Sequence, residues 1–267
     1  MLCAVLGSPI SHSLSPAMHR AAYAELGLDW SYEAVEVAAG DLAAFVGALG
    51  DDVRGLSVTA PLKREAAAAA HQRSGDVELL GVANTLIIED GMISAHNTDV
   101  PGGGAALEEA GVGSPVTARI LGGGATAASI ALTLVRLGVE QIEFVVRDPA
   151  RAAEAEAVAR GRGIGVTVRL IDDPLLEKVD LLVSTLPHEA IDARSHELAE
   201  SARAVFDVVY DPWPTGLARA AEAAGRPVIS GLDLLAHQAV LQVELMTGSG
   251  VSPQLLRDAA MAQLVRR

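Results

Sequence analysis

Two short strings near the start of the chain carry side chains that together suit acid–base chemistry on a small polar molecule. Ser13 and Ser15 place two hydroxyls on one tight turn, and Lys63 brings an ammonium group to the end of a strand-like run. Further along, Asp99 follows an asparagine and a threonine and adds a carboxylate. These groups suit a small polyhydroxylated acid, and a lysine–aspartate pair can move a proton at a reacting oxygen.

A glycine-rich string in the middle of the chain predicts a nucleotide-binding turn. It follows the apolar run 118–121 and opens a stretch with helical spacing, 126–137. Glycines let the backbone turn tightly and approach a pyrophosphate, while the helix N-terminus supplies free N–H groups and positive potential. The strand–turn–helix context separates this motif from an ordinary structural turn. The residues expected to bind a dinucleotide here are Gly122, Gly123, Gly124, Ala125 and Thr126.

The end of the next strand indicates which dinucleotide is preferred. It reads Val145-Val146-Arg147-Asp148-Pro149-Ala150-Arg151. Arginine at this place suits the 2′-phosphate of NADP, whereas a carboxylate suits the free ribose of NAD. Asp148 has two interpretations: it caps the next helix, which we favour, or it faces the ribose and shifts the preference toward NAD. We expect NADP, bound by Arg147 and Arg151.

Composition excludes several classes of protein. The 267 residues are 50% hydrophobic but only 3% aromatic, which is typical of α/β cores built from aliphatic side chains. The net charge of −14 argues against nucleic-acid and anionic-membrane partners. The single cysteine, Cys3, can form no internal disulfide, and no apolar run approaches the roughly 20 residues of a membrane span. Without a signal peptide or metal-ligand spacing, we expect a cytoplasmic protein that binds no metal.

Strand and helix patterns alternate along the first hundred residues, which predicts a mostly parallel sheet. An Asp90-Gly91 pair between two strand-like runs adds a hairpin with a tight turn. The expected strands lie at 3–7, 30–37, 55–58, 82–88 and 92–96, and the expected helices at 17–26 and 41–49.

A second alternating pattern begins after Pro101-Gly102-Gly103-Gly104, which we interpret as a hinge or domain boundary. The helical stretches 232–247 and 253–267 do not fit the repeat, so we expect them to return to the first domain. The sequence thus predicts an α/β protein with an N-terminal substrate domain, 1–101 plus 236–267, and a Rossmann-type dinucleotide-binding domain, 102–235. Expected strands of the latter lie at 118–121, 142–146, 166–170, 181–184, 204–208 and 227–229.

Besides the glycine and arginine strings, six further motifs lie along the chain: 7–19 (GSPISHSLSPAMH), 55–63 (GLSVTAPLK), 81–86 (GVANTL), 97–99 (NTD), 207–215 (DVVYDPWPT) and 231–238 (GLDLLAHQ). These eight motifs, in matching order, make the whole chain resemble the shikimate dehydrogenase family. The departures include Ser57 where the family has asparagine and Ser184-Thr185-Leu186-Pro187 in place of Asn-Ala-Thr.

The resemblance implies reversible, NADPH-dependent reduction of 3-dehydroshikimate to shikimate. It implies that Lys63 transfers the proton, that Asp99 holds Lys63, and that Ser13 and Ser15 bind the substrate carboxylate. The remaining implied substrate residues are Thr59, Asn84, Tyr210 and Gln238, and the remaining implied cofactor residues are Thr185 and Gly231.

Other functions remain open at this point. An NAD-dependent quinate/shikimate dehydrogenase would use the same residues, with Asp148 at the ribose. An aminoshikimate-type enzyme of a secondary pathway is a related alternative. A catalytically silent, ligand-sensing relative is a third, against which the intact Lys63 and Asp99 speak. A homodimer is among the assemblies we expect.

Overall fold

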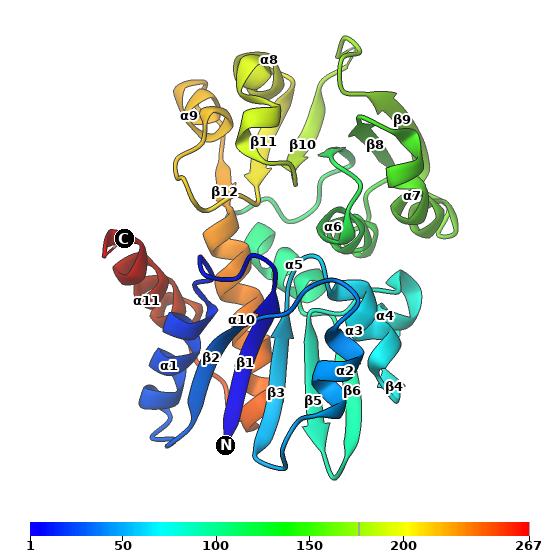
Figure 1. Cartoon of the computed structure of the whole chain (residues 1–267). Coiled ribbons are helices and arrows are strands. Elements are labelled where there is room, and N and C mark those ends of the chain that lie inside the picture. Colours follow the sequence, from blue (N-terminus) through cyan, green and yellow to red (C-terminus); the bar gives the residue numbers. More distant parts are fainter. Residues whose placement is uncertain (176, 267) are drawn as a thin grey trace. The chain divides into compact units, whose positions relative to one another are not determined.

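The chain folds into two compact α/β units, each with its own sheet (Figure 1). The computed structural model describes residues 1–175 and 177–266. The first unit comprises Met1–Gly102 and the residues from Ala236 onward, and the second is Gly103–Leu235. The sequence-based limits, after residues 101 and 235, differ from these by one residue at the first junction. Arg267, the end of the expected last helix, lies outside the described residues.

The first unit is built on a six-stranded sheet with the order β2-β1-β3-β5-β6-β4. β1 pairs in parallel with β2 and β3, whereas β5 is antiparallel to β3 and β6. The predicted hairpin is present: Asp90 and Gly91 adopt φ of 51° and 74°, as a tight hairpin turn requires. The strands are β1 (Leu2–Gly7), β2 (Ser31–Glu36), β3 (Val53–Val58), β4 (Gln72–Arg73), β5 (Thr85–Glu89) and β6 (Met92–His96).

Helices cover both faces of this sheet. α2 and α3 pack on one face, where Leu42 and Ala66 join the apolar cluster of Leu6 and Leu56. On the other face α10 approaches β3 closely, because a Cβ on Gly55 would lie 2.8 Å from Met246 Cγ. α11 packs against α1 (Figure 1). The helices are α1 (Ser15–Glu25), α2 (Leu42–Gly47), α3 (Lys63–Ala69), α4 (Gly75–Leu80), the part of α10 (Gly231–Thr247) from Ala236 onward, and α11 (Pro253–Val265).

The parallel arrangement of β1 and β3 positions the first set of chemical residues. Neighbouring parallel strands end at the same edge of a sheet. The serine turn follows β1, and the segment that carries Lys63 follows β3. Side chains more than 40 residues apart in the sequence are therefore delivered to one edge of the sheet.

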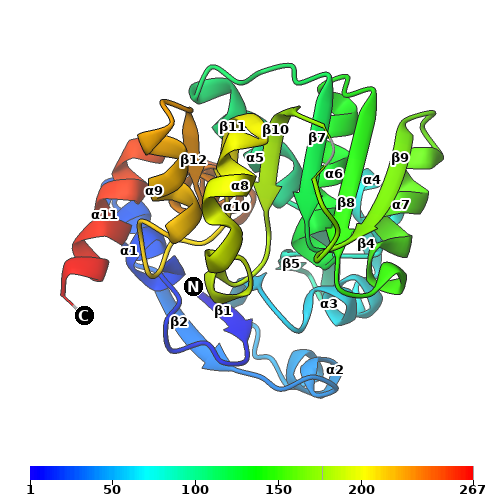
Figure 2. The same ribbon diagram turned by 90° about the horizontal axis from the view of Figure 1, so that it is seen from above.

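The second unit contains a wholly parallel six-stranded sheet with the order β12-β11-β10-β7-β8-β9. Right-handed crossovers run outward from β7 and β10 in opposite directions, which puts α6 and α7 on one face and α8 and α9 on the other (Figure 2). The strands are β7 (Thr117–Leu121), β8 (Gln141–Val146), β9 (Gly165–Leu170), β10 (Val179–Ser184), β11 (Ala202–Asp207) and β12 (Val228–Ser230). The helices are α6 (Ala125–Arg136), α7 (Ala153–Arg160), α8 (Ser195–Glu200) and α9 (Gly216–Ala223), with short 3-10 turns η1 (Pro149–Ala152), η2 (His188–Ala190) and η3 (Asp192–Arg194).

The Pro-Gly-Gly-Gly string at 101–104 differs from its expected form. It lies inside α5 (Asp99–Glu109), although the limit between the units does fall between Gly102 and Gly103. Pro101 is tolerated because it occupies the first helical turn, where its missing N–H needs no partner. A Cβ on Gly102 would lie 2.8 Å from the backbone N of Gln238. This glycine therefore permits close helix packing, which the sequence pattern does not distinguish from a hinge.

A buried arginine ties together three strands of the second sheet. Arg119 of β7 is 1% exposed, and its Nε contacts the carboxylate of Glu143 on β8. Its other nitrogens donate to Ser201 Oγ and to the carbonyl oxygen of Glu177, both at 2.9 Å. Arg169 of β9 contacts the same Glu143 at 2.5 Å from a more exposed position.

Arg119→Met should destabilise the protein far more than Arg169→Met. Loss of Arg119 leaves buried oxygen atoms without a donor and costs about 3 kcal/mol, whereas loss of the outer partner costs about 1 kcal/mol or less. Urea unfolding of both variants measures the difference. Equal losses of stability in the two variants would contradict the structural role assigned to Arg119.

Candidate active site

Lys63 and Asp99 form a close, largely buried ion pair. Lys63 Nζ lies 2.5 Å from Asp99 Oδ2, and the side chains are only 12% and 8% exposed. Each residue begins a helix, α3 and α5 respectively. The positive end of a helix favours a carboxylate and disfavours an ammonium group. The negative charge of Asp99 therefore compensates for the unfavourable position of the Lys63 charge at the start of α3. The arrangement holds an ammonium group, which is a proton donor, at a fixed point.

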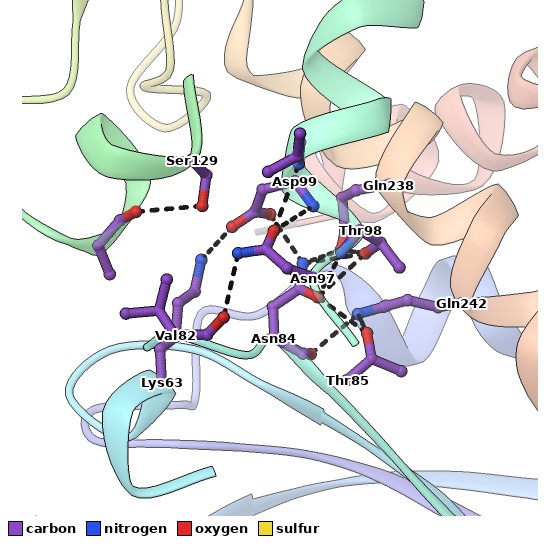
Figure 3. A network of polar contacts seen from close by, with 12 residues as sticks. Lys63, Val82, Asn84, Thr85, Asn97, Thr98, Asp99, Ser129, Gln238 and Gln242 are labelled. Atoms are coloured by element: carbon purple, nitrogen blue, oxygen red, sulfur yellow. Dashed lines mark hydrogen bonds and ion pairs between the residues drawn. The ribbon is translucent and has the colours of Figure 1, made fainter. Parts of the chain in front are cut away.

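Asn84 fixes the second oxygen of the Asp99 carboxylate. Its Nδ2 donates to Asp99 Oδ1 at 2.8 Å and to Thr98 Oγ1 at 2.9 Å. Its Oδ1 accepts from the backbone N–H of Thr98 at 2.9 Å, which settles the orientation of the amide. Gln238 Oε1 lies 3.3 Å from the same Nδ2 (Figure 3). Four of the predicted residues, Lys63, Asn84, Asp99 and Gln238, thus form one connected cluster.

Asn97 sets the start of the helix that carries Asp99. Its Oδ1 accepts from the backbone N–H groups of Asp99 and Val100 at 3.1 and 3.3 Å. Its Nδ2 donates to the carbonyl oxygen of Val82 at 3.2 Å, so the cap is itself anchored. The Asn-Thr-Asp motif therefore has a physical basis: the asparagine caps, the threonine orients Asn84, and the aspartate receives the lysine.

The serine turn forms a separate part of the first unit. Ser13 Oγ accepts from the backbone N–H of Ser15 at 3.3 Å, and Ser15 is 6% exposed at the start of α1. Thr59 lies against Gly7, the last residue of β1, since a Cβ on Gly7 would be 2.5 Å from Thr59 Cγ2. The contacts described for the two serines do not reach Lys63, so the structure leaves their role in substrate binding a prediction.

The glycine turn of the second unit leaves room for a ligand. Gly122 adopts φ of 107°, which favours glycine, and a Cβ on Gly123 would lie 2.4 Å from the carbonyl oxygen of Arg151. A Cβ on Gly124, by contrast, would meet no atom of the described residues within 4 Å. No described side chain caps α6, which begins directly after Gly124. This open approach to free N–H groups fits a dinucleotide pyrophosphate.

Thr185 places the end of β10 beside this turn. Its backbone N–H and its Oγ1 both donate to the carbonyl oxygen of Leu121, at 2.9 and 2.8 Å. β7 and β10 are the strands between which the crossovers change direction. In open α/β sheets, ligands bind at this switch point, outside the carboxyl ends of the strands.

The arginine segment lies next to the glycine turn. Arg147 directly follows β8, Arg151 lies in the 3-10 turn η1, and both are exposed. Asp148 Oδ1 accepts from the backbone N–H of Ala150 at 3.0 Å, with Pro149 in the first turn. The capping interpretation of Asp148 is therefore confirmed, and two cations remain at the place where an adenosine ribose would arrive.

Tyr210 and Gly231 occupy neighbouring segments of the second unit. Asp207, wholly buried, accepts from Thr215 Oγ1 at 2.7 Å and so closes the loop that contains Tyr210. Burial raises the pKa of Asp207, against the effect of hydrogen bonds from Thr215 and Val209. A Cβ on Gly231 would lie 1.9 Å from the carbonyl oxygen of Val208, so close backbone packing alone requires this glycine.

Sequence reasoning missed one central residue, Gln242. Its Nε2 donates to the carbonyl oxygen of Asn84 at 3.2 Å and to Thr85 Oγ1 at 3.0 Å. The available signal was helical spacing: Gln242 follows Gln238 by four residues and therefore lies on the same face of α10. A polar residue on an otherwise apolar stretch of this helix marks a buried contact.

The described residues contain no group of three or more His, Cys, Asp and Glu side chains that could hold a metal ion. Among the same residues, no helix has the length and apolar character needed to span a membrane.

Comparison with known proteins agrees with this geometry. A family profile described as the shikimate dehydrogenase substrate binding domain matches residues 5–86. A shikimate dehydrogenase (NADP(+)) from Mesorhizobium japonicum is 38% identical over 272 residues, covering 98% of this chain and 96% of that protein.

Solved structures extend the similarity to the whole fold. Shikimate dehydrogenase from Mycobacterium tuberculosis matches with a TM-score of 0.89 and 38% identity, covering 98% of this chain and 99% of that chain. Shikimate 5-dehydrogenase from Thermus thermophilus, in complex with NADP(H) and shikimate, matches with a TM-score of 0.84 and 33% identity, with coverage of 98% and 99%. By its similarity over nearly the whole of its length, the chain belongs to the shikimate dehydrogenase family.

Proposed function

We propose that this protein is an NADP-dependent shikimate dehydrogenase, which reversibly reduces 3-dehydroshikimate to shikimate. The observation that carries the proposal is the buried Lys63–Asp99 pair, fixed by Asn84, in a chain with NADP-dependent relatives along its full length. A fixed ammonium group beside a carboxylate is suited to proton transfer at a carbonyl or hydroxyl oxygen.

The residues of the first unit perform the proton transfer. Bound NADPH supplies the hydride for reduction, and NADP accepts it in the reverse direction. Lys63 donates a proton from Nζ to the substrate oxygen as the carbonyl becomes a hydroxyl, and recovers it in the reverse reaction. Asp99 holds Nζ in place through the 2.5 Å contact.

The hydroxyl and carboxylate groups of the substrate match the other polar side chains predicted for the site in the first unit. Asn84 and Gln238 meet at Thr98, and we assign both residues to the binding of ring hydroxyls. Ser13 and Ser15 supply hydroxyl and backbone donors for the substrate carboxylate, and we also assign Thr59, which lies against Gly7, to substrate binding. We assign Met1–Gly102 and the C-terminal helices to substrate binding on these grounds, and we assign a substrate contact from the second unit to Tyr210.

The second unit binds the cofactor in this proposal. The turn 122–126 receives the pyrophosphate at the N-terminus of α6, with Thr185 beside Gly122, and we also assign Gly231 to cofactor binding. Arg147 and Arg151 bind the 2′-phosphate, and the engagement of Asp148 as a cap supports NADP over NAD. The one buried, free cysteine suits a reducing compartment, which supports a cytoplasmic location.

Steady-state rates with shikimate and quinate, each with NADP and NAD, test the assignment directly. The highest kcat/KM is expected for shikimate with NADP. Absence of turnover with both acids and both cofactors would instead support a ligand-sensing role for this protein.

Lys63→Ala should reduce kcat by roughly 10²- to 10⁴-fold, because the variant lacks the proton donor. NADP binding, measured by fluorescence titration, should be unchanged. Lys178→Ala is the matched control, since Lys178 is an exposed lysine of the second unit and should retain full activity. A Lys63→Ala variant as active as the control would remove Lys63 from the mechanism.

Ser13→Ala and Ser15→Ala should each weaken shikimate binding. A hydrogen bond to a charged carboxylate contributes about 1.5–3 kcal/mol, so KM for shikimate should rise by roughly 10- to 100-fold while kcat changes less. Calorimetric titration and thermal melting are measured together. Normal shikimate affinity with an earlier melting transition would show that the serines serve the turn alone.

Arg147→Ala should weaken NADP binding much more than NAD binding, because the 2′-phosphate carries up to two charges in a protein of net charge −14. Added salt should reduce the difference in affinity between NADP and NAD. Arg162→Ala removes the same charge from another exposed position and should leave the ratio of NADP affinity to NAD affinity unchanged. A wild type that prefers NAD, together with tighter NADP binding by Asp148→Ala, would favour the quinate/shikimate alternative.

A further inference from the structure

A series of buried hydrogen bonds begins at Tyr32, on the face of the first sheet covered by α1 and α10. The Tyr32 hydroxyl donates to Ser57 Oγ at 2.6 Å, and Ser57 Oγ donates to Gln242 Oε1 at 2.9 Å. The three residues are 0%, 3% and 1% exposed. Burial raises the pKa of Tyr32, so its hydroxyl keeps the proton that it donates.

The same series continues from Gln242 to the carboxylate of Asp99. Gln242 Nε2 donates to Thr85 Oγ1 at 3.0 Å, and Thr85 Oγ1 donates to Asn84 Oδ1 at 2.9 Å. Asn84 Nδ2 then donates to Asp99 Oδ1 at 2.8 Å (Figure 3). Tyr32, Ser57, Gln242, Thr85 and Asn84 therefore form one relay that ends on the partner of Lys63.

Backbone groups fix the orientation of the two amides in this relay. The carbonyl oxygen of Asn84 accepts at 3.2 Å and can only accept, so the nitrogen of the Gln242 amide must face it. The backbone N–H of Thr98 donates to Asn84 Oδ1, which turns Asn84 Nδ2 toward Asp99. With both amides fixed, Ser57 Oγ donates to Gln242 Oε1 and Thr85 Oγ1 donates to Asn84 Oδ1, so the donors from Ser57 onward point toward Asp99.

His19 supplies a second donor to Gln242. Its Nε2 lies 3.3 Å from Gln242 Oε1, and its ring stacks on Tyr32 with centroids 4.0 Å apart. Burial lowers the pKa of His19 to about 4, so the ring is neutral at physiological pH. Because Gln242 Oε1 can only accept, Nε2 must carry the hydrogen. Gln242 Oε1 thus accepts from two buried donors, His19 and Ser57.

We propose that Gln242 is a positioning residue of the active site, which sets the orientation of Asn84 and thereby of Asp99 and Lys63. The inference rests on the proposed roles of Lys63 and Asp99. The buried amide of Gln242 has lost its hydration, and an apolar side chain would fill the same volume without that loss. Packing alone therefore does not explain a glutamine at this position. Consecutive hydrogen bonds in one direction strengthen one another in a low-dielectric interior, so the relay reinforces the final bond to the carboxylate.

Gln242→Met, which keeps the length of the side chain and removes its amide, tests the proposal. We expect kcat for shikimate oxidation to fall about 10-fold, while KM for NADP is unchanged and KM for shikimate changes less than kcat. A loss of stability alone also lowers the apparent kcat and leaves KM unchanged, so kcat is calculated per folded enzyme, counted by the stoichiometry of NADP binding.

Two tyrosines of the same buried cluster provide a matched pair. Tyr32→Phe removes the first donor of the relay and should lower kcat about 3-fold. Tyr23→Phe removes a hydroxyl that contacts Met246 Sδ at 3.7 Å and lies outside the relay, so its kcat should equal that of the wild type. Equal effects of the two substitutions on kcat would overturn the proposal.

Ser57 gives a further test if Gln242→Met does not fold. Ser57→Ala should lower kcat, and Ser57→Thr, which retains the hydroxyl, should restore it. Wild-type kcat in Ser57→Ala and Tyr32→Phe together would overturn the proposal.

A measurement without turnover separates this inference from the proposed function. The side-chain ¹⁵N–¹H signals of Asn84 should shift in Tyr32→Phe and stay in place in Tyr23→Phe. If the wild type does not oxidise shikimate, the proposed function fails, but these signals still decide whether the relay reaches Asn84. Unshifted signals in Tyr32→Phe would overturn the relay itself.

Discussion

The buried ion pair of Lys63 and Asp99 is the interaction on which the polar architecture of the first unit depends. Two charges with 12% and 8% side-chain exposure lose most of their hydration, and their mutual attraction compensates only when further hydrogen bonds complete the set. The fold supplies these bonds through Asn84 and through the helix start capped by Asn97. Much of the buried polarity of this unit follows from keeping one carboxylate and one ammonium group in place.

Close backbone approach has the corresponding role in the second unit. At Gly123 a side chain would collide with the segment that carries Arg151, whereas the space in front of Gly124 is open. The glycine turn and the arginine segment are therefore packed against each other. The turn leads from β7 into α6, and the arginine segment follows β8. A net charge of −14 repels a phosphate-bearing cofactor. The positive potential at the N-terminus of α6 and the charges of the two arginines compensate for this repulsion locally.

Elements defined by local chemistry were predictable from the sequence. The Asp90-Gly91 hairpin, the strand–glycine–helix unit and the cap formed by Asp148 all arise from backbone preferences of adjacent residues, and all three are present. The string at 101–104, interpreted as a hinge or domain boundary, does contain the limit between the units, but it lies inside a helix. Proline and glycine usually interrupt helices, but here Gly102 lies against α10, and the packing of that contact outweighs local propensity.

The amino-acid sequence alone was sufficient to predict the α/β class, the parallel-rich sheets, the family and the identities of the residues suited to chemistry. Those properties depend on periodicity and on short motifs, which are local along the chain. Tertiary structure decided which groups meet: that Asn84 orients Asp99, and that Gln242, Ser57 and Tyr32 join them from three separate elements. Such contacts link residues up to 185 positions apart. No local pattern encodes these hydrogen bonds. A buried polar group needs a partner, and the fold decides which residue lies within hydrogen-bond distance.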